Sequence, residues 1–388
     1  MRMKVGGVLS GALLISLAFL VACTSNNSTT PPSVSGAVLF VATQGDSLVS
    51  ALNVDVSTGV ITTIDKSSVA TGSTPSALVF TPAGDAAFIS NSGSNDVSSY
   101  AVNVNAGLTS AAASTAAGVS PHGMAVDAAG HFLFVANQGT SGDIDSGTVS
   151  VFSIGTSAAL TAAGNFKVNT DAEDTLPDAI NPGPFSVAIT PDGKFLYTAN
   201  QQANTVTGFS VDVTSGALTR VGAPVTVGTS PSGMAISPNG NFLYVTNSGS
   251  NNVSVFSICD NATPNCVTPD GSLAEITGSP FSAGLGPVQI TISFTGNFAY
   301  VVDQNSNQLS GYKLSPGSGT MTGTTPLATV STGLHPSWVA VSSGEQFVYV
   351  ANTGSNTVSA YTMDDTTGSL TVQGTPLTVG AQPSAVAF

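Results

Sequence analysis

Short runs of apolar residues alternate with polar turns rich in glycine and proline over most of the chain, and this arrangement recurs seven times. Its clearest copy spans Ser230–Phe256. Successive copies start 46 to 63 residues apart, and periods above 40 residues are typical of propeller blades with four strands. The proline that leads each copy is found at Pro75, Pro121, Pro184, Pro231, Pro287, Pro336 and Pro383.

One copy predicts four strands. The innermost is Met234–Ser237, and a Pro-Asn-Gly turn leads to the second, Phe242–Thr246. The second strand is apolar without alternation, as expected of a strand covered on both faces. The third is Val253–Ile258, and the fourth follows a Gly-x-Leu-Thr pattern such as Gly216–Thr219. We therefore expect an all-β protein whose four-stranded antiparallel blades pack face to face.

The two ends of the repeat complement each other. The first copy, at Leu39–Val41, has no proline-led strand before it, and the last strand, Pro383–Phe388, has no second strand after it. The pattern predicts that the C-terminal strand joins the first blade and closes a ring of seven blades over residues 36–388. Closure of this kind protects the edges of the sheets.

The first 35 residues have a different character. A short apolar run with two cations before it leads to Leu20–Cys23, which resembles the bacterial lipobox. That resemblance implies a lipoprotein signal peptide over residues 1–22 and lipidation of Cys23. The Ser/Thr/Asn/Pro-rich residues 23–35 then form a disordered tether. The alternative is an ordinary signal peptide with an incidental cysteine. With the lipid, we expect a monomer in the bacterial cell envelope, periplasmic or at the cell surface, held on the membrane only by its anchor.

The other two cysteines, Cys259 and Cys266, lie close together in a polar insert of the fifth copy. An exported chain meets oxidising conditions, so we expect a local disulfide between them.

Charged residues are scarce, and this restricts the ligands. Only 7% of residues are charged, with 7 basic and 21 acidic side chains, against about 25% in an average protein. So few cations build no basic patch for nucleic acid, and they disfavour sugar phosphates for the same reason. The expected partners are a neutral small molecule, a glycan or another envelope protein.

Candidate ligand-binding residues lie where two sets of turns meet at one end of the central channel. Next to the leading prolines most copies have small residues, and the exceptions are His122, Phe185, His335 and Trp338. Either histidine could act as a base or hold a metal together with Asp303; alternatively, each packs at the rim and bonds to backbone. The turns after the second strands carry mainly asparagine, which either faces a ligand or closes the turn. These positions are Gln44, Asn91, Asn137, Asn200, Asn247, Asp303 and Asn352, of which Asn137, Asn200 and Asp303 are our ligand-binding candidates.

Two acidic inserts follow in the third copy and in its connection to the fourth. Asp143 and Asp145 belong to the first, and the second spans Asp171–Asp174 and continues to Asp178. Clustered carboxylates could bind calcium, although their spacing matches no EF-hand loop and a solvated acidic loop is the alternative. We expect no other cofactor.

The repeat resembles a known family. The sequence Leu243–Asn247 followed by Val253–Phe256 is similar to the Tyr-Val-Thr-Asn repeat of bacterial surface propellers. The whole copy resembles the lactonase-like seven-bladed propellers, which include 6-phosphogluconolactonases and cycloisomerases of muconolactones. The resemblance covers residues 36–388 and implies a lactone site with a histidine near the start of a blade, matched by His122. It also implies arginines around the channel, but Arg220, the single arginine after the signal, falls on an outer strand.

Two functions follow from these observations. The first is a lipid-anchored module that binds or scaffolds a neutral ligand or an envelope partner. The alternative is a lactone hydrolase, a carboxylic ester hydrolase, with His122 as its base. Without cations to stabilise an oxyanion, the alternative lacks what is often the largest contribution to catalysis.

Overall fold

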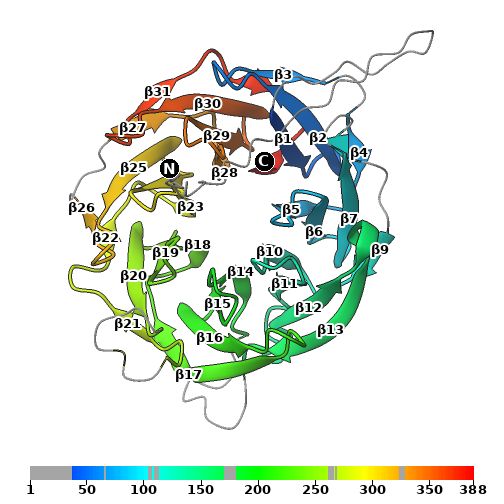
Figure 1. Cartoon of the computed structure of the whole chain (residues 1–388), viewed down its shortest axis with the longest axis vertical. Coiled ribbons are helices and arrows are strands. Elements are labelled where there is room, and N and C mark those ends of the chain that lie inside the picture. Colours follow the sequence, from blue (N-terminus) through cyan, green and yellow to red (C-terminus); the bar gives the residue numbers. More distant parts are fainter. Residues whose placement is uncertain are drawn as a thin grey trace, which may run out of the picture. The chain divides into compact units, whose positions relative to one another are not determined.

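Seven small antiparallel β-sheets are arranged as blades around a central axis (Figure 1). The computed structural model describes residues 37–388 except 65–66, 104–106, 109–112, 170–180, 261–265, 267–268 and 323–327. The predicted all-β, seven-bladed propeller is confirmed. The signal peptide, Cys23, the tether and the acidic insert at 171–178 lie outside the described residues.

The first four blades contain the following elements. Blade 1 has β1 (Ala37–Thr43), β2 (Leu48–Val54), β3 (Ile61–Thr63), β4 (Val69–Ala70) and the C-terminal β33 (Pro383–Ala387). Blade 2 has β5 (Pro75–Phe80), β6 (Ala86–Asn91), β7 (Asp96–Asn103), β8 (Gly107–Leu108) and β9 (Ala113–Ala116). Blade 3 has β10 (Pro121–Val126), β11 (Phe132–Asn137), β12 (Thr148–Ile154), the 3-10 turn η1 (Thr156–Ala158) and β13 (Leu160–Lys167). Blade 4 has β14 (Pro184–Ile189), β15 (Phe195–Asn200), β16 (Thr205–Val211) and β17 (Leu218–Thr226).

The last three blades repeat the plan. Blade 5 has β18 (Pro231–Ile236), β19 (Phe242–Asn247), β20 (Asn252–Ile258), β21 (Leu273–Glu275) and β22 (Phe281–Ser282). Blade 6 has β23 (Pro287–Ile292), β24 (Phe298–Asp303), β25 (Gln308–Leu314), β26 (Met321–Thr322) and β27 (Ala328–Ser331). Blade 7 has β28 (Pro336–Val341), β29 (Phe347–Asn352), β30 (Thr357–Met363), β31 (Leu370–Val372) and β32 (Leu377–Thr378). In five blades the outer strand is divided into two short segments that pair with the same third strand.

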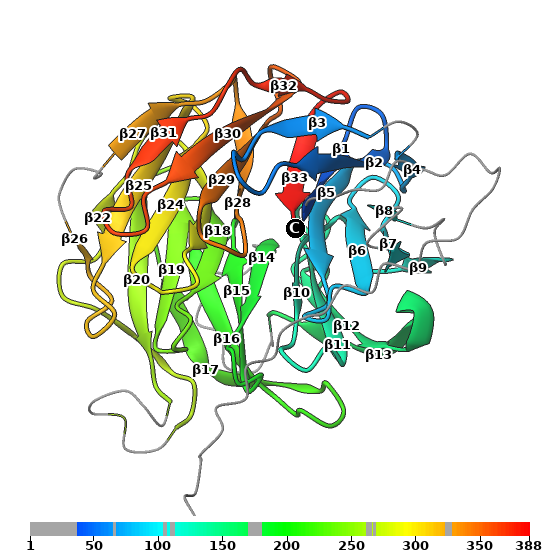
Figure 2. The same ribbon diagram turned by 45° about the horizontal axis from the view of Figure 1, so that its top comes forward.

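The C-terminal strand closes the ring, as the repeat predicted. Strand β33 pairs antiparallel with β1, with Val386 opposite Val41, and Figure 2 shows it at the inner edge of blade 1. It also contacts the inner strands β5 and β28 of the two adjoining blades. Strand β33 therefore supplies the inner strand of blade 1 and completes the circle of seven inner strands.

All seven tyrosines of the chain link neighbouring blades. Each is buried and donates its hydroxyl to a backbone carbonyl of an adjoining blade, over 2.5–3.2 Å. Burial raises the pKa of all seven phenols. Because hydrogen bonds are directional and apolar contacts are not, these bonds help to fix the orientation of each blade relative to its neighbour. The pairs are Tyr100–Ala70, Tyr197–Gly271, Tyr244–Gly319, Tyr300–Gly368, Tyr312–Ser282, Tyr349–Gly59 and Tyr361–Ser331.

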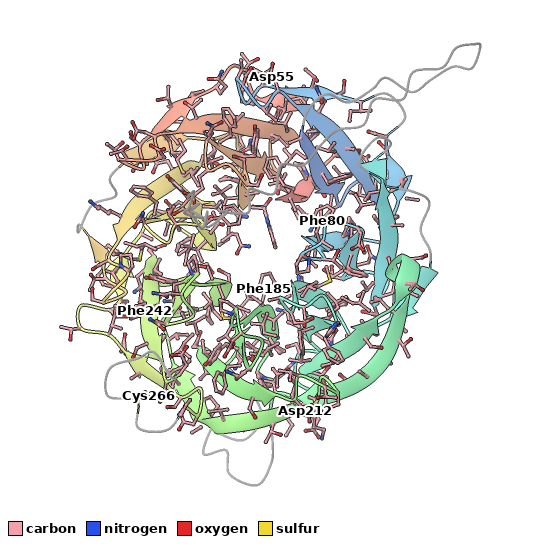
Figure 3. The ribbon with its side chains drawn as sticks, in the orientation of Figure 1. Asp55, Phe80, Phe185, Asp212, Phe242 and Cys266 are labelled. Atoms are coloured by element: carbon pink, nitrogen blue, oxygen red, sulfur yellow. A yellow bond between two sulfur atoms is a disulfide. The ribbon has the colours of Figure 1, made fainter. Side chains whose placement is uncertain are left out.

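Two further features complete the description of the fold. A disulfide joins Cys259 and Cys266, whose Cα atoms are 5.2 Å apart; Cys266 lies at the outer edge of blade 5 (Figure 3). Within the described ranges, no helix has the length and apolar character needed to cross a membrane.

Candidate functional site

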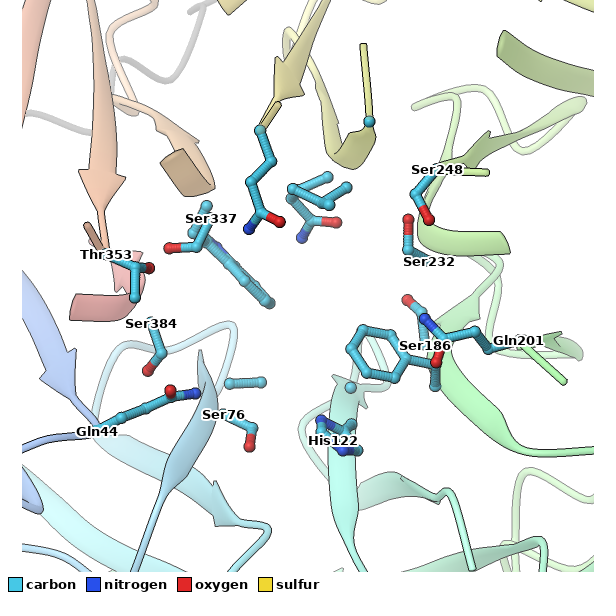
Figure 4. A pocket seen from close by; sticks show the side chains of 18 of the residues that line it. Gln44, Ser76, His122, Ser186, Gln201, Ser232, Ser248, Ser337, Thr353 and Ser384 are labelled. Atoms are coloured by element: carbon cyan, nitrogen blue, oxygen red, sulfur yellow. The ribbon is translucent and has the colours of Figure 1, made fainter. Parts of the chain in front are cut away.

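A cavity of about 480 Å³ opens at one end of the central axis (Figure 4). One ring of its lining is the residue directly after each leading proline, and a second ring is the residue directly after the second strand of a blade. Across the described residues that line it, there is no Asp, Glu, Lys or Arg. The first ring contains Ser76, His122, Phe185, Ser232, Val288, Ser337 and Ser384, and the second contributes Gln44, Gln201, Ser248, Gln304 and Thr353.

One backbone geometry recurs around the rim of the cavity. The residue before every leading proline has a positive φ of 48–64°. In five blades the backbone amide of this residue donates, over 2.7–2.8 Å, to the side-chain oxygen of an asparagine in the preceding blade. Each of these asparagines stands directly before the third strand of its blade, and the bond links the two neighbouring blades. These donor–acceptor pairs are Ser120–Asn95, Ser230–Asn204, Gly286–Asn251, His335–Asn307 and Gln382–Asn356.

His335 is one of these rim residues. It has a φ of 48°, its backbone amide donates to Asn307 Oδ1 over 2.7 Å, and its carbonyl accepts from the amide of Thr353 over 3.0 Å. Its side chain is exposed and does not line the cavity. The structure therefore separates His335 from His122 in the lining and from Asp303, which is buried.

His122 does line the cavity. Its ring stacks on Phe185, with centroids 4.4 Å apart, and its Nε2 lies 3.2 Å from Ser120 Oγ. Burial lowers the pKa of His122 to about 4, although a hydrogen bond with the Gln138 side chain opposes this shift. The imidazole is therefore neutral at pH 7. Because Phe185 comes from blade 4 and points toward the axis (Figure 3), this stacked pair spans the junction of blades 3 and 4.

Trp338, the only tryptophan of the chain, forms another apolar part of the lining. It extends from blade 7 and packs against the apolar clusters between blades 7 and 1, 1 and 2, and 2 and 3. At the same position the other copies have smaller residues, from glycine to Gln289. This one side chain therefore occupies space near the axis that the other blades leave free.

The asparagine candidates lie one layer behind the cavity wall. Asn137 and Asn200 are 0% and 1% exposed, and each side-chain amide donates to two hydroxyls on the third strand of its own blade. In blade 1 the equivalent residue is Thr43, and Gln44 is the next one, in the lining. Since successive side chains of a strand point to opposite sides, the residue that follows this position lines the cavity in five blades, as Gln201 does after Asn200.

Asp303 occupies the asparagine position of blade 6 and is also fully buried. Ser310 Oγ donates to its Oδ2 over 2.5 Å. Burial raises the pKa of this carboxyl to about 6, partly offset by hydrogen bonds from Ser310 and from the amide of Gly284.

Three of the glutamines in the cavity wall were not among the residues predicted from the sequence. Gln201, Gln289 and Gln304 line it together with Gln44, and Gln138 Nε2 donates to Gln201 Oε1 over 3.0 Å across the junction of blades 3 and 4. The signal was present, because glutamine stands one residue after the asparagine position where other copies have serine or threonine. These amides supply both donors and acceptors to the cavity.

The described acidic insert forms a tight turn away from this lining. The amide of Asp145 donates to Asp143 Oδ1 over 3.2 Å, and the Asp145 carboxylate pairs with Lys167 over 3.0 Å. Across the described part of the chain, no three His, Cys, Asp or Glu side chains gather closely enough to hold a metal ion.

The fold and the cavity define a seven-bladed propeller with an uncharged pocket at one end of its axis. The chain belongs to the lactonase family of seven-bladed β-propellers, whose model matches residues 35–173, 146–264 and 265–388. Among curated proteins, the comparison finds no match.

Solved structures share this fold. A proposed 6-phosphogluconolactonase from Bacteroides uniformis has a TM-score of 0.73 and 21% identity, covering 90% of this chain and 98% of its own. One from Bacteroides fragilis has the same TM-score and identity, with 93% and 99% covered. The periplasmic gluconolactonase of Pseudomonas aeruginosa has a TM-score of 0.72 and 22% identity, with 90% and 98% covered. At such identities the likeness concerns the fold, and activity has to be argued from the site.

Proposed function

We propose that this protein is a binding propeller whose cavity holds an uncharged ligand rich in hydroxyl groups, such as a small sugar or the end of a glycan. The observation that carries the proposal is the uncharged lining. A bound anion would lose water without gaining a cation, and burying an unpaired charge is strongly unfavourable. Amides and hydroxyls instead match neutral hydroxyl groups, and His122, Phe185 and Trp338 offer apolar ring faces.

The sole tryptophan provides the test. Because Trp338 lines the cavity, its fluorescence is expected to change saturably on titration with neutral probes: glucose, N-acetylglucosamine and maltotriose. Glucose 6-phosphate and gluconate serve as the charged probes and are expected to bind more weakly. Gln201→Ala removes a lining amide and is expected to weaken binding, whereas Gln373→Ala, outside the lining, is the matched control. Tighter binding of the phosphorylated probe, or no saturable response to any neutral probe, would overturn the proposal.

Lactone hydrolysis with His122 as general base is the second candidate function. It is favoured by the family and by a neutral imidazole that lies in the lining. Against it, a base whose pKa is about 4 is weak at neutral pH, and the lining provides no cation for a developing oxyanion. Turnover of neutral lactones by the wild-type protein that disappears in His122→Asn would establish the enzyme and replace the binding-only function.

We also propose that the protein is lipid-anchored at Cys23 and works in the cell envelope. The lipobox-like sequence supports the anchor, and the structural relative from Pseudomonas aeruginosa is described as periplasmic. Metabolic labelling with palmitate tests the anchor, and label that persists in Cys23→Ser contradicts it.

A further inference from the structure

Blade 6 carries a buried carboxyl where five other blades carry an amide. In those five, the asparagine Nδ2 donates to a hydroxyl on the third strand over 2.8–3.0 Å. In blade 6 the direction is reversed, because Ser310 Oγ donates to Asp303 Oδ2. An ionised carboxylate only accepts hydrogen bonds, whereas a protonated one donates as an amide does. Protonation of Asp303 therefore restores the donor that the other blades have.

Among the described residues, no cation contributes to the pKa shift of Asp303. The interactions that set its pKa are burial and hydrogen bonds from Ser310 and Gly284. Of the elements packed against it, β25 contributes one titratable neighbour, the Tyr312 phenol, whose pKa burial raises. The segment 283–286 and Pro287 of β23, which pairs with Asp303, have no titratable side chains. The ionised form is thus a buried charge held by dipoles alone, which is unfavourable.

Asp303 is directly continuous with the cavity wall. The next two residues, Gln304 and Asn305, line the cavity, as does Gly286. The amide of Gln304 donates to the carbonyl of Gly286 over 2.9 Å, and that of Asn305 donates to Leu285 over 3.0 Å. Residues 284–286 and 303–305, which adjoin the carboxyl, therefore also contribute to the blade 6 wall.

We propose that Asp303 makes this wall responsive to protons, so that the cavity binds its neutral ligand more tightly when Asp303 is protonated than when it is ionised. The regulatory part rests on the proposed function. An ionised Asp303 favours arrangements in which water reaches the carboxylate, and water reaches it by displacing residues 284–286 or 303–305. A ligand held by Gln304 and Asn305 favours the closed wall. By linkage, ligand binding then raises the pKa of Asp303 by the same free energy with which protonation strengthens binding.

The first measurement needs no ligand. Amide hydrogen exchange of peptides covering 283–287 and 303–308 is followed from pH 5 to 8, after correction for the intrinsic pH dependence of exchange. In the wild-type protein we expect protection to fall as the pH rises through about 6, and in Asp303→Asn we expect it to stay high. Asn247→Asp is the matched reverse variant, because Asn247 donates to Ser254 in blade 5 as the other asparagines do. It is expected to transfer the pH dependence to the peptides around 228–230 and 247–249.

The second measurement is the affinity for maltotriose, followed by Trp338 fluorescence over the same pH range. His335, the exposed histidine on this rim, is replaced by asparagine in all samples, since asparagine tolerates its positive φ. We expect tighter binding at pH 5 than at pH 8, and no such difference in Asp303→Asn. An equal pH response with and without Asp303, in exchange or in affinity, would overturn the proposal. If maltotriose and the other neutral probes fail to bind at every pH, the proposed function fails, and the exchange result still decides whether Asp303 controls the wall.

Discussion

Removing the hydroxyl of Tyr349 tests what holds the ring closed. Tyr349 in blade 7 is 0% exposed, and its hydroxyl donates over 2.9 Å to the carbonyl of Gly59 in blade 1, 290 residues away in the sequence. Tyr349→Phe keeps the buried ring and deletes only the donor. The Gly59 carbonyl then loses its partner in a buried place, which costs about 1–3 kcal/mol of the free energy of unfolding. We therefore expect a clear loss of stability from the removal of one oxygen atom.

Blade 3 offers the opposite substitution. Phe134 is the third residue of its second strand, as Tyr349 is in blade 7. Gly216 of blade 4 lies close to the ring of Phe132, just as Gly59 lies close to the ring of Phe347. Gly216 is therefore the equivalent of Gly59 at the junction of blades 3 and 4. Phe134→Tyr is expected to form the missing bond to Gly216 and to add about 0.5–1.5 kcal/mol.

Urea denaturation provides the assay. The midpoint is followed by Trp338 fluorescence and by far-ultraviolet circular dichroism, and the two must coincide before a free energy is taken from either. The Tyr349→Phe midpoint is expected to fall without a change of slope. A Tyr349→Phe protein with the wild-type midpoint would refute the reasoning, since it would mean that the hydroxyl bond contributes nothing beyond the packing of the ring.

Three other substitutions test the packing, the pH dependence and the disulfide. A Cβ at Gly123 would lie 2.7 Å from the Cα of Ser186 in the next inner strand, so Gly123→Ala is expected to lower the thermal midpoint of unfolding. The control is Gly317→Ala, where a Cβ would have nothing within 4 Å and no such loss is expected. Equal effects of the two substitutions would contradict the close approach of the inner strands. The pKa of His122 is lowered from 6.5 to about 4 in the folded protein, so the unfolded chain takes up the proton at a higher pH than the folded protein does. The free energy of unfolding therefore falls as the pH drops from about 6.5 to about 4. His122→Gln is expected to reduce this loss in an acid titration, and an unchanged loss of stability would contradict the expectation. Replacing Cys259 and Cys266 by serine removes a disulfide between residues 7 positions apart in the sequence. The free energy of unfolding, measured with urea, is expected to fall by about 2–3 kcal/mol. An unchanged midpoint would show that the disulfide does not constrain the unfolded chain.

The repeat predicted some of the cavity residues correctly and others incorrectly. The sequence placed His122, Phe185 and Trp338 at the mouth because they break a pattern of small residues, and all three line the cavity. It placed Asn137, Asn200 and Asp303 there because the turns after the second strands share this end of the channel, but these side chains are buried behind the wall. A shift of one residue separates the buried asparagine from the lining glutamine, and alternation along a strand turns that shift into opposite directions. The repeat identifies the position in each blade, but only the fold shows which of two neighbouring side chains faces the cavity.

The sequence by itself determined the ring: seven proline-led copies, their four strands and a C-terminal strand that completes the first blade. These follow from local hydrophobic periodicity and turn chemistry, which each segment carries in its own residues. Only the tertiary structure decided that the cavity wall is uncharged, that His335 lies exposed on the rim and that Asp303 is buried without a cation. Burial and electrostatic environment depend on which blades stand side by side, and the contacts responsible join residues far apart in the chain.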